Sequence, residues 1–196
     1  MPTDTYIRTT YIEGNGAIIN TNHIPTLKTS IEFEMMPIDY TGENYIGFPY
    51  TLAGNNDNKD FRFFAVSSSE MYFDFTNRRI GPIGPNNINF NTNTWYHVKC
   101  YNNGMTISYT GTTTSGSATY TGITATTSPY NCPIHIFGNS ITGAVNFKLK
   151  YLKIYENDVL MKHLEAAINP NNEAGFYDFT NKIWYGSINS SNMIAR

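Results

Sequence analysis

Two glutamates near residue 30 are spaced so that they could act together on a bound substrate. Glu32 and Glu34 flank Phe33 in a stretch, residues 30–35, that alternates polar and apolar side chains. Such alternation predicts a half-buried β-strand, on which side chains two positions apart share one face. Paired carboxylates are the groups that cleave glycosidic bonds, one as an acid and the other as a base or nucleophile. The alternative is a pair of glutamates that simply face solvent, and we favour this second interpretation.

The other residue types used in catalysis are not arranged for it. The histidines, at positions 23, 97, 135 and 163, lack the short spacings of zinc ligands. The sequence contains no G-x-S-x-G nucleophile motif and no phosphate-binding loop. His97 lies three residues before Cys100, so on a strand the two side chains point to opposite faces and cannot form a thiolate–imidazole pair. We therefore expect that the chain is not an enzyme.

An oxygen-rich segment, residues 54–60, is the candidate metal site. Asn55, Asp57 and Asp60 offer amide and carboxylate oxygens, which are the ligands that calcium prefers. The segment lacks the D-x-D-x-D-G arrangement of a calcium loop, and the charge of Lys59 opposes a cation. We favour an exposed polar loop, and we keep the two aspartates and Asn55 as the residues that would hold calcium.

A candidate ligand surface lies on the hairpin predicted for residues 61–66 and 71–75. Alternation puts one set of side chains toward the core and the other set on the opposite face. The second set combines aromatic and charged groups: Arg62, Tyr72 and Asp74, with Arg78 and Arg79 at the rim. Aromatic platforms and planar hydrogen-bonding groups suit a sugar, and we predict that these residues bind one. The alternative is that loops or another subunit cover this face.

Strands must position these groups, because the chain has the composition of a β protein. Of its 196 residues, 15% are aromatic and 14% are charged, and Thr, Tyr, Asn and Gly are abundant. The clearest hairpin spans residues 95–109 and turns at Asn102-Asn103-Gly104. Residues 158–168 could be helical, but their apolar positions do not follow a 3.6-residue period, so we predict a strand. Short strands between turns predict an antiparallel sandwich or barrel.

Charge and hydropathy exclude two classes of partner. The net charge is −2 and the chain has no run of Lys or Arg, so we expect no binding to nucleic acid. No segment approaches the roughly 20 apolar residues of a membrane helix, so we expect no membrane insertion. The first ten residues do not form a signal peptide, which predicts synthesis in a cytoplasm unless a leader is missing. Cys100 and Cys132 could pair, and we favour two reduced thiols.

Four segments resemble laminin-G-like domains of the concanavalin A-like class, which are common in gut bacteria and their phages. Residues 11–21 (YIEGNGAIINT) are similar to the start of these domains, and residues 93–98 (NTWYHV) to a central strand with a tryptophan. Residues 152–160 (LKIYENDVL) and 175–182 (GFYDFTNK) are similar to the terminal signature. The middle loops, which usually carry ligand sites in this fold, have no match.

The resemblance implies an all-β fold, an antiparallel two-sheet jelly-roll sandwich, with one domain over residues 1–196 and a core at about 11–194. Glycan-cleaving enzymes of this fold carry an E-x-D-x-x-E or E-x-D-x-E string, which this chain lacks. The matched motifs have structural explanations: Asp178 can hold a turn through its side chain, and Asn181 can adopt a left-handed conformation.

We therefore expect a non-catalytic surface-recognition or decoration protein, a capsid or tail component of a phage that binds glycans. Its partners would be a glycan or cell-surface polymer, or other virion proteins. The Met start, the missing secretion signal and the neutral surface rich in Asn and Thr favour the virion surface. The alternative is a stand-alone lectin-like module of a gut bacterium, located outside the cell.

Overall fold

The computed structural model shows an all-β chain of antiparallel sheets, as the composition predicts. The structure describes residues 5–38, 44–47, 60–67, 70–76, 78–83, 91–110, 115–129, 131–139, 143–144, 146–189 and 191–196. These segments contain no helix, and so none that is long and apolar enough to span a membrane.

The larger sheet contains 11 strands. Eight of them follow one another in the order β11-β10-β9-β4-β15-β16-β17-β18, while β1 pairs with β16, β2 with β15, and β19 with β2. Their bounds are β1 (Ile7–Arg8), β2 (Ile12–Glu13), β4 (Thr29–Pro37), β9 (Tyr96–Tyr101), β10 (Gly104–Thr110), β11 (Ser115–Thr121), β15 (Phe147–Glu156), β16 (Val159–Ile168), β17 (Ala174–Asp178), β18 (Ile183–Tyr185) and β19 (Ile194–Ala195).

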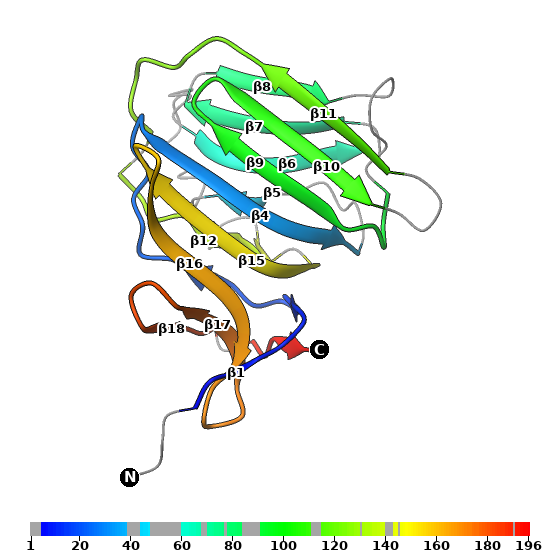
Figure 1. Cartoon of the computed structure of the whole chain (residues 1–196), viewed down its shortest axis with the longest axis vertical. Helices are drawn as coiled ribbons and strands as arrows, with labels where there is room; N and C mark the ends of the chain where they lie inside the picture. The colour runs from blue at the N-terminus through cyan, green and yellow to red at the C-terminus, as the bar shows by residue number, and fades with distance from the viewer. Residues whose placement is uncertain are drawn as a thin grey trace.

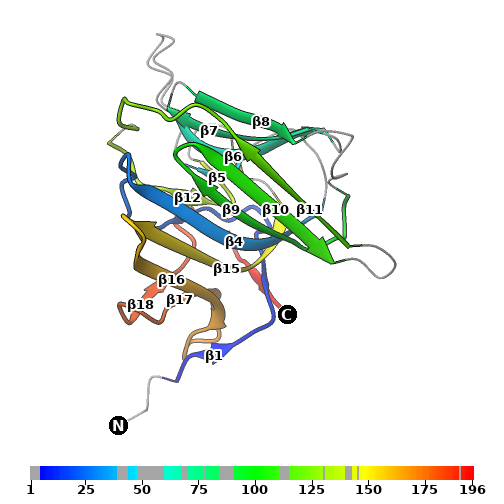
Figure 2. The ribbon, with the colours of Figure 1, turned by 45° about the horizontal axis from the view of Figure 1, so that its top comes forward.

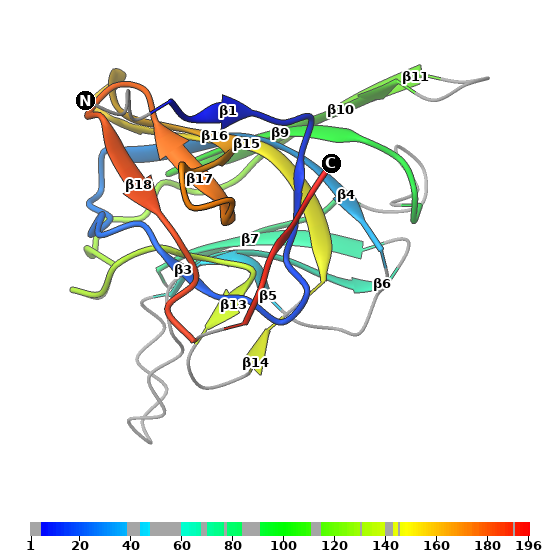
Figure 3. The same ribbon diagram turned by 90° about the horizontal axis from the view of Figure 1, so that it is seen from below.

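The smaller sheet has the order β3-β12-β5-β6-β7-β8, and a separate ribbon joins β13 to β14. Their bounds are β3 (Ile19–Asn20), β5 (Asn44–Gly47), β6 (Asp60–Ser67), β7 (Glu70–Thr76), β8 (Arg78–Ile83), β12 (His135–Ile136), β13 (Gly138–Asn139) and β14 (Gly143–Ala144). In Figure 1 and Figure 2 the strands β4, β9 and β10 lie in front of β5, β6 and β7. Figure 3, seen from below, separates these two layers.

The core lies between the two layers and is rich in aromatic side chains. Phe33 of β4 meets Phe63 of β6 edge to face, with ring centroids 5.2 Å apart, so the contact joins the two sheets. The predicted inward set on β7 is confirmed, because its members are fully buried: Met71, Phe73 and Phe75. Burying one such side chain contributes about 1.5–3 kcal/mol.

Several local predictions can be compared directly with the strands. The β9–β10 hairpin turns at Asn102 and Asn103, as predicted, and residues 159–168 form a strand. Cys100 and Cys132 are both free thiols. One local prediction was wrong: the left-handed residue in the β17–β18 turn is Lys182, with φ of 61°, and not the asparagine before it.

Candidate functional site

The two glutamates of β4 lie near the middle of the larger sheet, on its outer face. Ile31, Phe33 and Met35 are fully buried in the core, while Glu32 and Glu34 alternate with them and are only partly buried. β9 pairs with one side of β4 and β15 with the other. Side chains from both neighbouring strands therefore surround the two carboxylates.

Strand register places complementary groups beside each glutamate. On β9, Lys99 lies opposite Glu32 and His97 lies opposite Glu34. On β15, Lys153 lies opposite Glu32, and Tyr151 lies opposite Glu34. Neighbouring strands are about 4.8 Å apart, so these side chains form two rows across the outer face.

Glu32 has hydrogen-bond donors on three sides. Its Oε1 accepts from Lys153 Nζ at 3.0 Å and lies 3.3 Å from His97 Nε2, and its Oε2 accepts from the Tyr155 hydroxyl at 3.3 Å. Burial alone would raise the pKa of Glu32, but the hydrogen bonds and charges of Lys153 and His97 outweigh it and hold the pKa below its usual value. Glu32 is thus held as a carboxylate, suited to accept hydrogen bonds or to act as a base.

Glu34 is paired with Lys150, and this pair forms one wall of a hollow. The Lys150 ammonium group contacts Glu34 Oε1 and lies 4.3 Å from the centroid of the Trp95 ring. Lys150 reaches this position because the register of β15 shifts between Leu149 and Tyr151. The hollow has a volume of about 340 Å³ and is lined by Glu34, Trp95, His97, Ser108, Tyr109 and Lys150.

Tyr151 and Tyr155 add hydroxyl donors to the same face. Burial, together with the charges of Glu32 and Glu34, raises the pKa of Tyr151 well above its usual value. Burial and Glu32 also raise the pKa of Tyr155. Both phenols therefore stay protonated at neutral pH and can donate a hydrogen bond, but neither is suited to act as a base.

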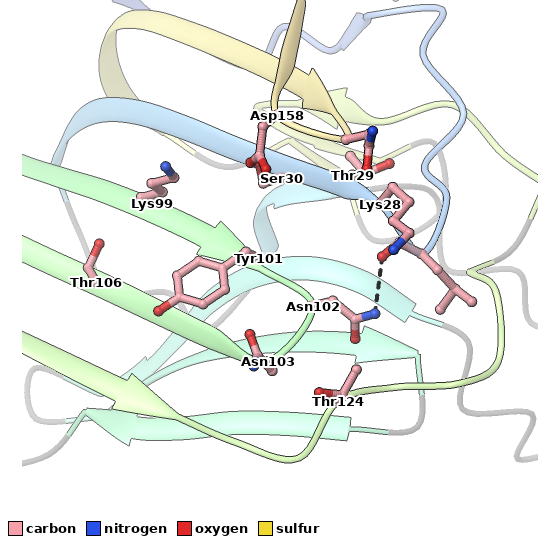
Figure 4. A pocket seen from close by; sticks show the side chains of 12 residues that line it. Lys28, Thr29, Ser30, Lys99, Tyr101, Asn102, Asn103, Thr106, Thr124 and Asp158 are labelled. Carbon is pink, nitrogen blue, oxygen red and sulfur yellow. Dashed lines mark hydrogen bonds between the residues drawn. The ribbon is translucent and has the colours of Figure 1, made fainter.

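A second hollow, of about 630 Å³, opens where the β9–β10 hairpin faces the β15–β16 turn. Figure 4 shows the side chains around it, which come from β4 and the residues just before it, from β9 and β10, from the two turns and from the segment after β11. They are Leu27, Lys28, Thr29, Ser30, Lys99, Tyr101, Asn102, Asn103, Thr106, Thr124, Asn157 and Asp158. Asn102 holds the β9–β10 turn against the neighbouring segments, because its side-chain amide donates to Leu27 O and Ala125 O, each at 3.1 Å.

The two hollows adjoin one another on the sheet. His97 and Ser108 are a cross-strand pair of β9 and β10 in the smaller hollow, and Lys99 and Thr106 are the next outward-facing pair, in the larger hollow. Residues two apart on a strand share a face and lie roughly 7 Å apart. We call this surface, from Trp95 past Glu32 to the β15–β16 turn, the outer groove.

In the structure, only some residues of the ligand surface predicted for the smaller sheet lie together. Arg62 and Arg79 both bind Asp74, with nitrogen–oxygen distances of 2.8 Å, and the Arg79 guanidinium lies 5.1 Å from the Tyr72 ring centroid. Arg78 does not join them, because it is paired with Phe75, whose side chain faces the core. The buried carboxylate of Asp74 is thus neutralised within the protein, and the sugar-binding role of these residues stays a prediction.

The predicted calcium ligands cannot all be compared with the structure. Asn55 and Asp57 lie outside the described residues. Asp60 begins β6, where its carboxylate lies 3.4 Å from Arg62, and burial raises its pKa. Within the described part of the chain, no cluster of three or more His, Cys, Asp or Glu side chains could hold a metal. Calcium binding therefore stays a prediction.

The chain is similar in structure to a domain of a phage tailspike. No family model and no curated protein matches the chain. The solved structure is the enzymatically active domain of tailspike protein 2 of bacteriophage CBA120, at a TM-score of 0.47 and 11% sequence identity. The match covers 80% of this chain but only 28% of the tailspike structure.

This comparison contradicts the prediction that the chain is not an enzyme, because the similar structure is an enzymatically active domain. The prediction rested on the absence of several catalytic motifs, among them the E-x-D-x-x-E string. The absence of that string excludes one arrangement of catalytic carboxylates and leaves all others open. We count the prediction as wrong and draw no function from the likeness itself.

The sequence indicated the outer groove more weakly than the other two candidate sites. The shared face of Glu32 and Glu34 was predicted correctly, but our preferred interpretation was that they simply face solvent. In the structure each is paired with a lysine of β15, more than 100 residues further along the chain. Only the pairing of β4 with β15 brings these groups together.

Proposed function

We propose that the chain is a glycan-binding protein that holds a polysaccharide along the outer groove. The observation that carries this proposal is the lining of two adjoining hollows, which combines a partly exposed tryptophan, a glutamate–lysine pair and tyrosine hydroxyls. The second glutamate–lysine pair, Glu32 and Lys153, lies beside them on the same face. Sugar rings pack their apolar faces on aromatic side chains, while their hydroxyls need donors and acceptors at fixed positions. The ion pairs around Glu32 and Glu34 fix those positions before the ligand arrives.

We also propose that the two facing sheets form a jelly-roll sandwich of the concanavalin A-like or laminin-G-like class. The order of the larger sheet and the four resembling sequence segments support this assignment. The second part of the sequence-based expectation, a place on a phage virion, rests on the neutral surface rich in Asn and Thr. Finding the protein at fixed stoichiometry in purified particles would support it, whereas a stand-alone lectin-like module would be absent from them.

A glycan array followed by titration of the bound polymer tests the proposed function. Replacing Trp95 by Ala removes the aromatic wall of the smaller hollow, and we expect affinity to fall about tenfold or more. Trp95→Phe keeps a ring and is expected to retain most of the affinity. Melting temperatures of both variants show whether the fold is intact.

Tyr72→Ala tests the other surface that the sequence predicts to bind a sugar, because Tyr72 lies on the outer face of the smaller sheet, next to Arg79. We expect no change in affinity for this variant. A loss of binding in Tyr72→Ala but not in Trp95→Ala would place the site on the smaller sheet. An array without any bound glycan would refute the proposal.

Cleavage of the bound polymer is measured in the same titration, as new reducing ends or new unsaturated ends. Glu32 is held as a carboxylate, so it could serve as a base or nucleophile but is not poised to be the protonated acid. If the polymer is cut, Glu32→Gln and Glu34→Gln will show which carboxylate the reaction requires.

A further inference from the structure

Two lysines in the larger hollow lack the carboxylate partner that Lys150 has in the smaller hollow. Lys28 and Lys99 are exposed and line the hollow. Among the described residues, no carboxylate forms an ion pair with either of them. Their two positive charges outnumber the single carboxylate of the lining, so the hollow carries a net positive charge that attracts an anion.

The contrast with the neighbouring cations is clear. Lys150 is paired with Glu34, Lys153 with Glu32, and Arg8 with Glu165 at 3.0 Å. Each of those charges is balanced within the protein. Of the lysines that line the two hollows, Lys28 and Lys99 are therefore the ones without an ion pair in the described part of the chain, and both lie in the larger hollow, at the end where the β9–β10 hairpin lies.

Asp158 is the one carboxylate in the lining of this hollow. In Figure 4 it lies at the β15–β16 turn, between Lys28 on one side and Lys99 on the other. Asp158 adopts a left-handed conformation, with φ of 64°, which asparagine also tolerates. Its charge can therefore be removed by substitution with asparagine without straining the turn.

The rest of the lining favours a sugar over a nucleic acid. Most of its other groups are hydroxyls and amides, which match the hydroxyls of a sugar: Ser30, Tyr101, Asn103, Thr106, Thr124 and Asn157. The Thr29 hydroxyl and the Asn102 amide are already hydrogen-bonded within the protein. Affinity for nucleic acid comes largely from neutralised phosphates, and two lysines can neutralise at most two of them. The hollow, at about 630 Å³, falls within the size range of small-ligand sites.

We propose that the larger hollow binds the anionic substituent of an acidic sugar, so that the polysaccharide held in the outer groove is an acidic one. This inference rests on the proposed function. Lys99 and Lys28 contact the anion, while the hydroxyl and amide groups around them bind the sugar ring. The substituent is a carboxylate, as in uronic acids, or a sulfate, since both offer the same negative oxygens to the lysines.

The test compares four polymers on the full chain: polygalacturonate, dextran sulfate, neutral dextran and oligodeoxythymidylate. We expect the first or the second to bind most tightly, and which of them does so identifies the anionic group. Binding should weaken as the salt concentration rises, because the lysines are exposed. Lys99→Gln and Lys28→Gln should each weaken acidic binding about two- to fivefold, as the loss of one exposed ion pair implies.

Asp158→Asn tests whether removing a negative charge from the larger hollow strengthens binding of the acidic polymer. Removing this negative charge should strengthen binding of the acidic polymer by about two- to fivefold, because it removes a repulsion at the rim of the hollow. Lys182→Gln is the matched control: Lys182 is also exposed, but it lies in the β17–β18 turn, away from the outer groove. We expect it to leave affinity unchanged.

Three results would overturn the inference. If dextran binds as tightly as the acidic polymers and Trp95→Ala abolishes that binding, the protein binds glycans but not through an anion site. If oligodeoxythymidylate is preferred and Lys99→Gln weakens it, the ligand is a nucleic acid. If no polymer binds, and the array is also empty, the proposed function fails together with this inference.

Discussion

Asp178 is a fully buried carboxylate at the end of β17 that organises the turn to β18. Its Oδ1 accepts hydrogen bonds from the backbone N–H groups of His163 at 3.1 Å and Thr180 at 2.9 Å, and from that of Asn181 at 3.3 Å. Its Oδ2 accepts from the Asn181 side chain at 2.7 Å. Burial would raise the pKa of Asp178, but these hydrogen bonds outweigh it and hold the pKa below its usual value.

We predict that Asp178→Asn destabilises the protein by about 1–3 kcal/mol, because an amide nitrogen replaces one of the two acceptor oxygens. The folded-state pKa is lowered, so the charged side chain stabilises the fold above its unfolded-state pKa of about 3.9 and loses this effect as pH falls through the folded value. The gap between wild type and variant should therefore narrow in acid. Urea unfolding at several pH values measures it, and a gap that widens in acid would contradict the prediction.

At the scale of single residues, the sequence indicates local roles but not distant partners. The turn role of Asp178 follows from its own side chain and its neighbours in sequence, and it was predicted. The shared face of Glu32 and Glu34 follows from strand alternation and was also predicted. The lysines that pair with Glu32 and Glu34 were not predicted. Pairing across strands depends on the strand register, which residue spacing along the chain does not reveal.

At the scale of elements, β17 depends on a glycine that lets a tryptophan lie close to the backbone. A Cβ atom at Gly175 would overlap the Trp184 ring and would lie 2.7 Å from the backbone oxygen of Tyr185. Trp184 in turn lies beside Tyr6, with ring centroids 5.6 Å apart, and Tyr6 stacks on Tyr177 at 4.0 Å. The missing side chain thus allows β18 and the N-terminal segment to pack on β17.

We predict that Gly175→Ala destabilises the protein by about 1–3 kcal/mol, the usual cost of overpacking. The backbone contact with Tyr185 cannot be relieved by a side-chain rotation, so β18 has to shift. Gly186→Ala is the graded control, because its Cβ would lie 3.3 Å from Trp184 Nε1 and a small displacement relieves the contact. Tryptophan fluorescence during thermal unfolding reports both variants, and equal stability of the two would refute the argument.

Element types were predicted better than element details. The β9–β10 hairpin and β16 follow from an Asn-Gly turn and from a failed helical period, both of which are local signals. The register shift in β15 that carries Lys150 toward Trp95 has no local signal. A bulge places two residues of one strand opposite one residue of its partner, so it cannot be recognised before the partner strand is known.

At the scale of the whole molecule, the two sheets are joined through their aromatic inner faces. Phe63 of β6 contacts Phe33 of β4, and Phe33 lies between the two glutamates of the outer groove along the strand. The strand alternation predicted which residues face inward, but the choice of facing partners depends on how the sheets stack. The outer groove is therefore supported from behind by the smaller sheet.

We predict that Phe63→Ala destabilises the whole protein by about 3–5 kcal/mol, because it leaves a cavity between the sheets. For a chain of this length that corresponds to a fall in melting temperature of roughly 6–20 °C. Phe63→Leu, which fills most of the space, should cost less than about 1.5 kcal/mol. Circular dichroism and calorimetry should both show one shifted transition, since the contact couples the two sheets.

The same variant separates stability from binding. The Phe63 side chain is fully buried and faces the core, so the outer groove should keep its affinity for the bound polymer within about twofold at temperatures where Phe63→Ala is folded. Two separate unfolding transitions in Phe63→Ala would contradict the coupling, because they would mean that each sheet holds its structure alone. A loss of affinity at low temperature, with the fold intact, would mean that the position of β4 depends on the packing behind it, so that the smaller sheet sets the spacing of Glu32 and Glu34 in the groove.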